Sequence, residues 1–332
     1  MTTGVPEDGP FAEERSALDE AAAVVESADV APEAEHEMAV LDQRRRIMFV
    51  HAHPDDETIN NGATMAMYAA ANVHVTLLTC TLGEEGEVLV PGLAHLAAAE
   101  GDQLGGYRYH ELSLAMQELG VTDYRLLGGP GRWRDSGMMG LPTNDVPRAF
   151  WQADTKEATG ELVAVVREVR PQVLVTYDGN GGYGHPDHIQ SHRVAMAAVD
   201  AAADPAFAQE TGDPWSVPKV YWNVLPRSAI QRGIDVMIAA GESNLFGVTS
   251  ADELEFVVPD EVVTAVLDGT EWLPRKIAAM RAHASQIAAD GPFFALMEKV
   301  GESAFGHEFF QLVRGERGPG DGPETDLFAG LT

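Results

Sequence analysis

Short apolar runs alternate with stretches of helical spacing through most of this chain, and no other sequence feature limits the fold as strongly. The apolar runs have the length of buried strands, and Ile47–Ala52 is the first of them. The stretches between them span about 10 to 20 residues and are typical of helices. The expected strands are 47–52, 73–80, 124–127, 173–178 and 219–225, and the expected helices are 62–72, 98–119, 155–170 and 187–203.

A strand, a helix and a second strand in this order form a βαβ unit, in which the two strands run parallel. Repetition of this unit predicts an α/β fold, Rossmann-like and layered, with a mainly parallel sheet. After residue 225 the pattern is less regular: a strand near 253–258, a helix at 270–289 and a Gly- and Pro-rich stretch at 315–324. We therefore expect an α/β core over 43–225, and a smaller α+β subdomain over 226–332 that belongs to the same functional unit.

Residues 1–42 differ in composition from the rest of the chain. They contain twelve acidic side chains and one basic side chain, Arg15, together with three prolines. Their apolar residues are too few to hold a folded structure, so this segment is predicted to be a disordered acidic extension.

The composition excludes several classes of function. Acidic residues number 52 and basic residues 22, which gives a net charge of −30 that would repel nucleic acids and anionic membranes. No apolar run reaches the roughly 18 residues needed to span a bilayer. The single cysteine, Cys80, excludes a disulfide framework and a thiolate zinc site. These features favour a cytoplasmic protein, and they leave its oligomeric state open.

Two related motifs carry most of the chemical information. HAHPDDE, residues 51–57, follows the first expected strand, and YGHPDH, residues 183–188, comes shortly after the strand at 173–178. Both therefore lie at the carboxyl ends of parallel strands, where open α/β sheets bind their ligands. Two His-Pro-Asp tripeptides at two such places are unexpected by chance in a chain with 11 histidines. The motifs therefore predict one shared site.

The residue types in these motifs suit a catalytic metal ion. His53 and Asp56 are close enough in one turn to share an ion, and His188 adds a third ligand from the second motif. Two neutral imidazoles and one carboxylate leave a coordination position open for water, as in catalytic zinc sites. Such an ion lowers the pKa of its water and polarises a carbonyl group.

The neighbours of these residues can move protons. Asp55 is placed to take a proton from the water, and His185 to donate to an oxyanion or a leaving nitrogen. Asp187 can hold a ligand imidazole by its second nitrogen. Simpler alternatives remain open, because all three side chains are also suited to capping the start of a helix.

With these residues in view, the chain resembles the PIG-L/LmbE-type metal-dependent deacetylases, which remove acetyl groups from N-acetylglucosamine-containing substrates. The resemblance covers about residues 46–330 and is densest up to about 225. Four further segments are similar to the actinobacterial branch of this family that acts in mycothiol biosynthesis: TCTLGEEGEV (79–88), DQLGGYR (102–108), GRWRDSGM (131–138) and YDGNGGYGHPDH (177–188).

The resemblance implies a role for each matching residue. It implies one zinc ion held by His53, Asp56 and His188, with ferrous iron as an alternative occupant. The implied general base is Asp55 and the implied acid or oxyanion partner is His185. Tyr183 is implied to be a mobile group that helps to stabilise the tetrahedral intermediate. The implied contacts to a sugar–inositol substrate are Arg108 and Asp135, with Glu87 lining the pocket.

The implied reaction is deacetylation of 1-D-myo-inositol 2-acetamido-2-deoxy-α-D-glucopyranoside to the free amine and acetate. A mycothiol S-conjugate amidase of the same family is an alternative, and a non-catalytic metal- or sugar-binding module is another. A ferrous oxygenase also uses two His and one carboxylate, but such enzymes are generally all-β. The sequence GNGGYG at 179–184 matches a nucleotide-binding pattern, yet the acidic HPDH that follows it would repel phosphate.

Overall fold

The computed structural model describes residues 44–241, 247–289 and 306–331, together with residues 291, 293, 294 and 297. The chain divides into two units, Met1–Arg44 and Arg45–Thr332, and the description below concerns the second. The acidic extension predicted for residues 1–42 lies outside the described residues.

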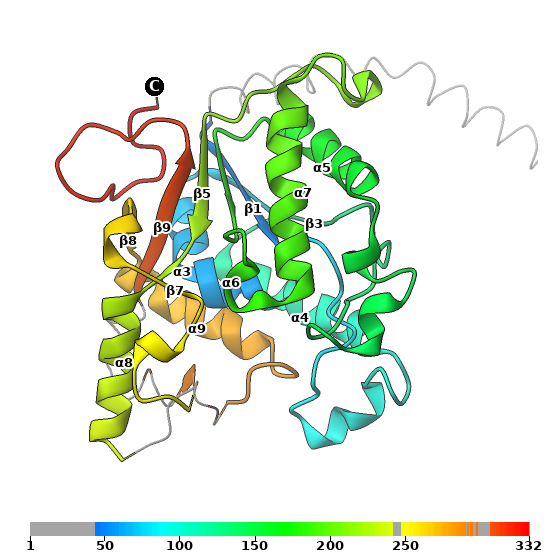
Figure 1. Cartoon of the computed structure of the whole chain (residues 1–332), viewed down its shortest axis with the longest axis vertical. Helices are drawn as coiled ribbons and strands as arrows, with labels where there is room; N and C mark the ends of the chain where they lie inside the picture. The colour runs from blue at the N-terminus through cyan, green and yellow to red at the C-terminus, as the bar shows by residue number, and fades with distance from the viewer. Residues whose placement is uncertain are drawn as a thin grey trace, which may run out of the picture. The chain divides into compact units, whose positions relative to one another are not determined.

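A seven-stranded sheet forms the centre of this unit (Figure 1). The first five strands along the chain pair in parallel, which confirms the predicted mainly parallel sheet. Two later strands continue the sheet: β9 pairs antiparallel with β5, and β8 pairs antiparallel with β9. In spatial order the strands are β3 (Asp123–Leu126), β2 (His74–Thr79), β1 (Arg46–His51), β4 (Val173–Thr176), β5 (Lys219–Asn223), β9 (His307–Arg314) and β8 (Ala265–Asp268).

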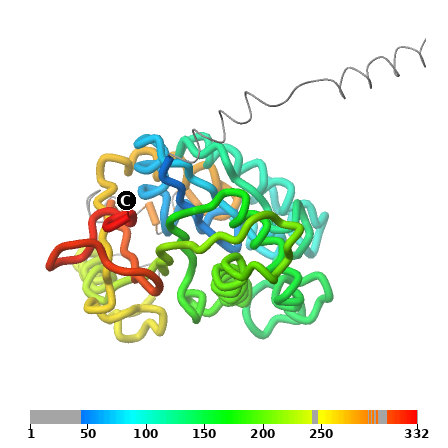
Figure 2. The backbone as a smooth tube through the Cα atoms, turned by 90° about the horizontal axis from the view of Figure 1, so that it is seen from above, coloured from blue at the N-terminus to red at the C-terminus, as the bar shows by residue number. Residues whose placement is uncertain are grey.

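Helices cover both faces of the sheet, because successive side chains of a strand point to opposite faces and each central strand is apolar on both. In β1, Ile47 and Phe49 belong to one hydrophobic cluster, whereas Met48 and Val50 belong to the other. In Figure 2 the orange α9 and the green α7 lie on opposite sides of the blue strand β1. The first cluster packs against α3 (Asp56–Ala70), α4 (Leu104–Leu119) and α9 (Leu273–Ala282), and the second against α5 (Thr155–Val169) and α7 (Pro186–Ala203).

Two helices begin at other places than expected. Helix α3 begins at Asp56 instead of residue 62, so the carboxylates of the first motif lie in its first turn, where they complement the helix dipole. Helix α4 begins at Leu104 instead of residue 98, because Asp102 has a φ of 50° that a helix does not allow.

The chain after residue 225 is more closely joined to the main sheet than its irregular pattern indicates. It supplies β8 and β9, which the sequence did not predict, and the helix α8 (Arg227–Ala239). The strand expected near 253–258 is reduced to β7 (Val257–Val258), which pairs with β6 (Leu225–Pro226) in a separate two-stranded sheet. The division of the catalytic unit at residue 225 stays a prediction.

The strand order places the two motifs together. Strands β1 and β4 are neighbours in the sheet, although β2 and β3 lie between them in sequence. After β1 the chain adds β2 and β3 on one side of it, and then returns to add β4 and β5 on the other side. The order of the strands reverses between β1 and β4, and ligands of open α/β sheets bind at the carboxyl ends of the strands at such a point. In the part of the chain that the structure describes, no helix combines the length and the apolar character needed to cross a membrane.

Candidate active site

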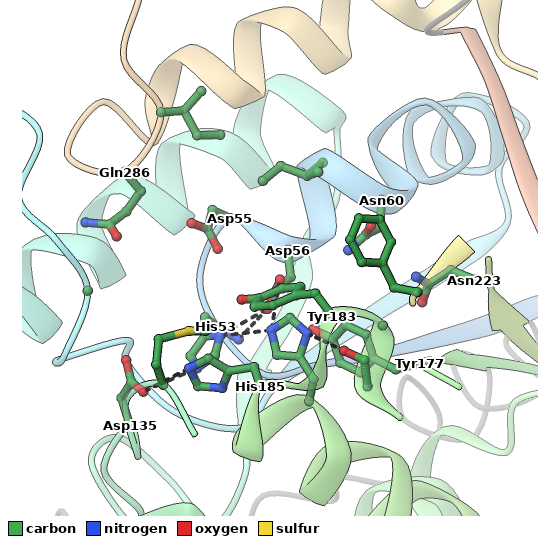
Figure 3. Close-up of a pocket in the computed structure, with 18 of the residues that line it drawn as sticks. His53, Asp55, Asp56, Asn60, Asp135, Tyr177, Tyr183, His185, Asn223 and Gln286 are labelled. Carbon is green, nitrogen blue, oxygen red and sulfur yellow. Dashed lines mark hydrogen bonds and ion pairs between the residues drawn. The ribbon is translucent and has the colours of Figure 1, made fainter. Parts of the chain in front are cut away.

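A pocket of about 660 Å³ opens at the carboxyl ends of β1 and β4 (Figure 3). Both motifs line it, together with the loops that follow β2 and β3 and a segment after α9. Of the residues that the sequence singled out, Asp187 alone is absent from the lining, since it lies fully buried behind it. The predicted residues in the lining are His53, Asp55, Asp56, Glu87, Arg108, Asp135, Tyr183, His185 and His188.

Three predicted ligand side chains meet at the floor of the pocket. His53 Nδ1 lies 3.3 Å from Asp56 Oδ2 and 3.3 Å from His188 Nε2, and His188 Nε2 lies 3.4 Å from Asp56 Oδ1. Ligands at zinc bond lengths around a tetrahedral ion stand about 3.3 to 3.4 Å apart, whereas an octahedral ion with similar bonds needs about 2.9 Å. The two imidazole nitrogens therefore have the spacing of ligands around a tetrahedral ion, and each of them lies near a different oxygen of the Asp56 carboxylate.

The second nitrogen of each imidazole is occupied by an acceptor. His53 Nε2 lies 3.2 Å from Asp187 Oδ2, and His188 Nδ1 lies 3.2 Å from the carbonyl oxygen of Gly181. These acceptors orient the two rings so that their inner nitrogens face each other at 3.3 Å. Two nitrogens placed in this way can bind one metal ion between them.

Charges around the floor favour a cation as well. Burial alone would lower the pKa of His53, but Asp135, Asp187 and Asp56 surround the ring and hold that pKa well above its ordinary value. Burial would raise the pKa of Asp56, yet the two imidazoles, that of His188 above all, hold it well below its usual range. Three carboxylates thus surround the His53 ring, and their negative charge favours a cation there.

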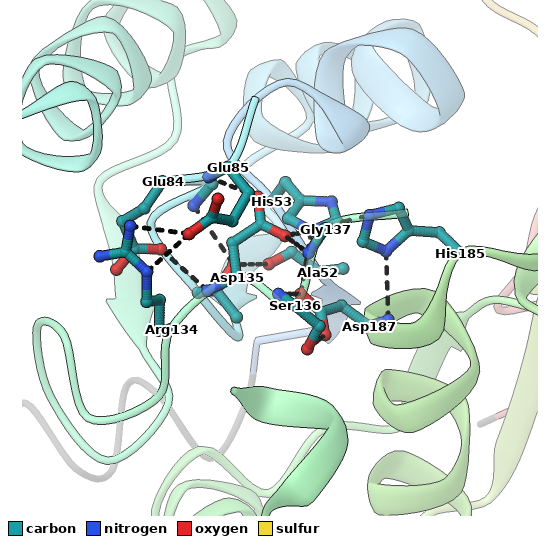
Figure 4. Close-up of polar contacts among 12 residues, drawn as sticks. Ala52, His53, Glu84, Glu85, Arg134, Asp135, Ser136, Gly137, His185 and Asp187 are labelled. Carbon is teal, nitrogen blue, oxygen red and sulfur yellow. Dashed lines mark hydrogen bonds and ion pairs between the residues drawn. The ribbon is translucent and has the colours of Figure 1, made fainter. Parts of the chain in front are cut away.

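Asp187 is itself held firmly, as expected for a residue that orients a ligand histidine. Its Oδ2 accepts the backbone N–H of Ser136 at 2.9 Å, and its Oδ1 accepts the Ser136 hydroxyl (Figure 4). A residue that the sequence did not single out supports the other imidazole: the Tyr177 ring stacks on His188, with 4.3 Å between the ring centroids. Tyr177 lies in the YDGNGGYG segment, so the signal that could have found it was present.

Asp55 has an unusual backbone conformation, with φ 133° and ψ −32°. Residues other than glycine rarely adopt a positive φ, and such strain costs on the order of 1 to 3 kcal/mol and is concentrated at functional sites. Asp55 occupies the N-cap position of α3, but its side chain makes no capping hydrogen bond. The simpler alternative of a helix cap therefore does not account for this carboxylate.

The surroundings of Asp55 suit a general base. Burial raises the pKa of Asp55 to about 6; the Arg108 guanidinium, whose Nη2 lies 3.1 Å from Asp55 Oδ2, opposes this shift and the charge of Asp56 adds to it. A carboxyl group with this pKa is ionised at neutral pH and still accepts a proton readily.

His185 faces the metal ligands from the second motif. Its Nδ1 accepts the backbone N–H of Asp187 at 3.1 Å, so it does cap α7, and the proton of the neutral ring is then on Nε2. Burial lowers the pKa of His185 to about 3, with the charges of His53 and His188 adding to the effect. A neutral ring with an Nε2–H can donate a hydrogen bond at neutral pH, so the capping role and a catalytic role are compatible.

Tyr183 lies on a glycine-rich turn beside these histidines. Its side chain is 52% exposed, and its ring centroid lies 5.0 Å from that of His188. The turn needs its glycines, because Gly181, Gly182 and Gly184 all have positive φ. The mobile role predicted for Tyr183 stays a prediction.

The three residues predicted to contact the sugar have different surroundings. Arg108 is buried and donates to the carbonyl oxygens of Gly83 (2.8 Å) and Pro54 (2.6 Å), in addition to its ion pair with Asp55. Asp135 Oδ1 lies 3.5 Å from His53 Nε2 and accepts the N–H of Gly137 (Figure 4). Glu87 is exposed at the pocket. Their contacts with a substrate stay predictions.

The pocket also contains three amide side chains that the sequence did not reveal: Asn60, Asn223 and Gln286. Figure 3 shows Gln286 beside Asp55 and the two asparagines together on another side. Asn60 lies one helical turn after Asp56, and this spacing was a signal that could have found it. Asn223 and Gln286 lie far from both motifs in sequence and belong to no pattern.

Solved structures share this fold. Two of them are N,N'-diacetylchitobiose deacetylase from Pyrococcus horikoshii and 4-carboxy-2-hydroxymuconate hydratase from Pseudomonas putida. The first has a TM-score of 0.55, is 20% identical and covers 87% of this chain and 94% of its own; the second has a TM-score of 0.56, is 18% identical and covers 83% and 99%. A deacetylase and a hydratase share the fold, so the fold alone does not define the reaction.

Sequence comparison is more specific. The family model PIG-L, described as GlcNAc-PI de-N-acetylase, matches residues 48–199. Two relatives bear the name 1D-myo-inositol 2-acetamido-2-deoxy-alpha-D-glucopyranoside deacetylase. The one from Geodermatophilus obscurus is 65% identical over 86% of this chain and 98% of its own length, and the one from Streptomyces avermitilis is 58% identical over 86% and 97%. The family resemblance seen in the two motifs is thereby confirmed, and the chain belongs to the PIG-L family.

Proposed function

We propose that this protein is a metal-dependent hydrolase that removes the acetyl group from 1-D-myo-inositol 2-acetamido-2-deoxy-α-D-glucopyranoside, as a step of mycothiol biosynthesis. The observation that carries the proposal is the set of two imidazole nitrogens and one carboxylate at tetrahedral spacing beside Asp55, whose pKa burial raises to about 6. The two relatives named for this reaction, at 65% and 58% identity, support the substrate.

We assign the metal to His53, Asp56 and His188, and this set of two imidazoles and one carboxylate, which leaves a position for water, supports zinc. Zinc bound there would supply a water of lowered pKa and polarise the acetamide carbonyl. Asp187 keeps the His53 ring in the orientation and tautomer that binding requires, through its contact with Nε2.

The chain's own residues move the protons. Asp55 takes a proton from the water as its oxygen attacks the amide carbon, and returns it to the nitrogen when the C–N bond breaks, which yields the free amine and acetate. His185 donates its Nε2–H to the carbonyl oxygen as that oxygen gains negative charge. Its pKa of about 3 favours the oxyanion partner over the general acid, because the neutral ring has only a hydrogen bond to offer.

The rest of the pocket suits a neutral, hydroxyl-rich substrate. Carboxylates, amides and a guanidinium line it, and each can bind hydroxyl groups. The excess of carboxylates disfavours an anionic substrate. We propose a cytoplasmic location for the protein. Its single cysteine, Cys80, is a free thiol, as is usual for proteins of that reducing compartment.

Acetate release from this sugar–inositol by purified, zinc-loaded protein tests the proposal, with a mycothiol S-conjugate assayed in parallel. We expect acetate release to exceed conjugate cleavage. Faster conjugate cleavage would keep the metal chemistry and assign the protein to the amidase side of the family. Turnover of neither substrate by metal-replete protein would favour a binding module.

Replacing His185 by Ala is expected to lower kcat about 100-fold, because loss of one oxyanion donor typically has an effect of this size. The pH profile should keep its shape between pH 5 and 8, since a group with a pKa of about 3 does not titrate there. Steady-state kinetics from pH 5 to 8 measure both effects, and the metal content shows whether the variant still binds its ion. His192→Ala is the control: His192 lies on the same helix and does not line the pocket, and its Nδ1 lies 3.0 Å from the backbone carbonyl oxygen of Tyr177. A changed profile with unchanged kcat would contradict this role.

A further inference from the structure

The last residue of the first motif, Glu57, makes a contact that the proposed reaction does not use. Its Oε1 lies 2.8 Å from Nε2 of His283, and both side chains are 0% exposed. Glu57 is in the first turn of α3, and His283 directly follows α9. Removing two titratable groups from water costs free energy, and only a well-formed contact between them offsets this cost.

The second carboxylate oxygen of Glu57 holds the backbone of Asp55. Glu57 Oε2 accepts the N–H of Asp55 at 2.9 Å. The carbonyl oxygen of Asp55 accepts the N–H groups of Thr58 and Ile59, each at 3.1 Å, so both backbone groups of Asp55 are held. These contacts surround the residue whose φ is 133°, and a conformation of this kind persists only when its surroundings impose it.

His283 links the same contact to the wall of the pocket. Its carbonyl oxygen accepts the N–H of Gln286 at 2.9 Å and that of Ile287 at 2.8 Å, and both of these residues line the pocket. Between them, Ser285 donates its N–H and its hydroxyl to Glu111 of α4, at 2.8 and 2.6 Å. The segment that carries Gln286 is therefore held to His283 at the end of α9 and, through Ser285, to Glu111 of α4.

We propose that Glu57 and His283 are positioning residues for the reaction, which hold the strained backbone of Asp55 so that its carboxylate faces the attacking water. The inference rests on the proposed function, since it concerns the general base of that reaction. It gives a positioning role to Glu57, the last residue of HAHPDDE, and to His283, which lies 226 residues further along the chain.

The expected effect is on kcat. Glu57→Ala removes the acceptor of the Asp55 N–H and lets the backbone leave its strained conformation, and a displacement of about 1 Å at a reacting group lowers the rate about 100-fold. KM should change less than about threefold, because the side chain of Glu57 bonds Asp55 and His283 and not Glu87 or Asp135, which are predicted to contact the sugar. Metal content should stay the same. Glu57→Gln keeps an oxygen for the Asp55 N–H and should restore kcat to within about tenfold of the wild type.

A matched control separates positioning from general loosening of α9. Lys276 lies on this helix and pairs with Glu308, with 2.7 Å between Nζ and Oε1, and both side chains are buried. Neither residue lines the pocket. Lys276→Met should lower the melting temperature and leave kcat within about twofold of the wild type.

The experiment measures kcat, KM, metal content and melting temperature for the zinc-loaded variants, and solves a crystal structure of Glu57→Ala. The inference is overturned if Glu57→Ala keeps its kcat, if Lys276→Met loses as much as Glu57→Ala, or if the φ of Asp55 stays near 133° in the variant. Should Glu57→Ala fail to fold, His283→Ala takes its place, with an expected loss of about tenfold in kcat at unchanged KM. Unchanged kcat in that variant overturns the inference as well.

Failure of this inference and failure of the proposed function give different results. If the wild-type protein releases acetate and the Glu57 and His283 variants keep its kcat, only the positioning role is refuted. Wild-type protein that releases no acetate refutes the proposed reaction, and the positioning role with it.

Discussion

Replacing Asp55 by Asn is expected to lower kcat about 1,000-fold, in the middle of the range for loss of a general base, while the protein stays folded and binds its metal. The amide has the shape of the carboxylate, and Asn tolerates the positive φ of this position better than most residues. What the amide lacks is the ability to accept a proton from water. Steady-state kinetics of acetate release, with metal content measured in parallel, check this result.

The pH dependence should change in the same variant. Burial raises the pKa of Asp55 to about 6, and a base must be deprotonated to act, so wild-type kcat/KM should fall as the pH decreases through this region. A bound cation favours the carboxylate and places this limb at or below pH 6. In Asp55→Asn the limb should disappear, because the group that titrates is gone.

Asp178→Asn is the control for this substitution. Asp178 also lines the pocket, but its Oδ1 accepts the N–H groups of Asn180 and Gly182, and an amide oxygen can do the same. This control should keep kcat within a few-fold of the wild type. If Asp55→Asn retained more than a tenth of the wild-type kcat, another group would have to be the base.

The parts of the site that the sequence predicted are those whose chemistry lies in short contiguous motifs. The sequence predicted that His53, Asp56 and His188 lie in one place, and the structure brings their side chains within 3.4 Å of one another. The shared ion stays a prediction. The three residues meet because each motif follows a strand, directly or after a short loop, and parallel strands present their carboxyl ends at one edge of the sheet. The parallel core was predictable for the same reason, since each unit of strand, helix and strand is local in sequence.

What the sequence did not predict depends on contacts between distant segments. No local pattern shows that Asn223 and Gln286 reach the pocket, or that His283 contacts Glu57 across 226 residues. Strand β9 pairs with β5 only because the chain returns to the sheet edge after residue 305, and this return is decided by packing. Arg108 illustrates the same point at the site, because its ion pair with Asp55 competes with the sugar contact predicted for it.

Removal of the metal is expected to abolish acetate release, with a loss of at least about 1,000-fold, since a bound ion contributes several kcal/mol of charge stabilisation in the transition state. The melting temperature should fall too, because the ion binds the folded chain and no preformed site exists in the unfolded one. Zinc should restore both. Magnesium should restore neither, since it requires octahedral oxygen ligands and the floor offers two imidazoles at tetrahedral spacing.

Two isosteric substitutions distinguish a ligand from a residue that orients a ligand. Asp56→Asn replaces a ligand carboxylate and should prevent zinc binding at micromolar concentration, and activity should disappear with it. Asp187→Asn weakens only the contact to His53 Nε2, and such a change typically lowers metal affinity about 10- to 100-fold, so excess zinc should restore much of the activity. Zinc titrations of the two metal-free variants measure this difference. Weaker zinc binding by Asp187→Asn than by Asp56→Asn would place the ion on the other side of the His53 ring, between Asp135 and Asp187. Metal-free protein that still turned over would exclude metal catalysis altogether.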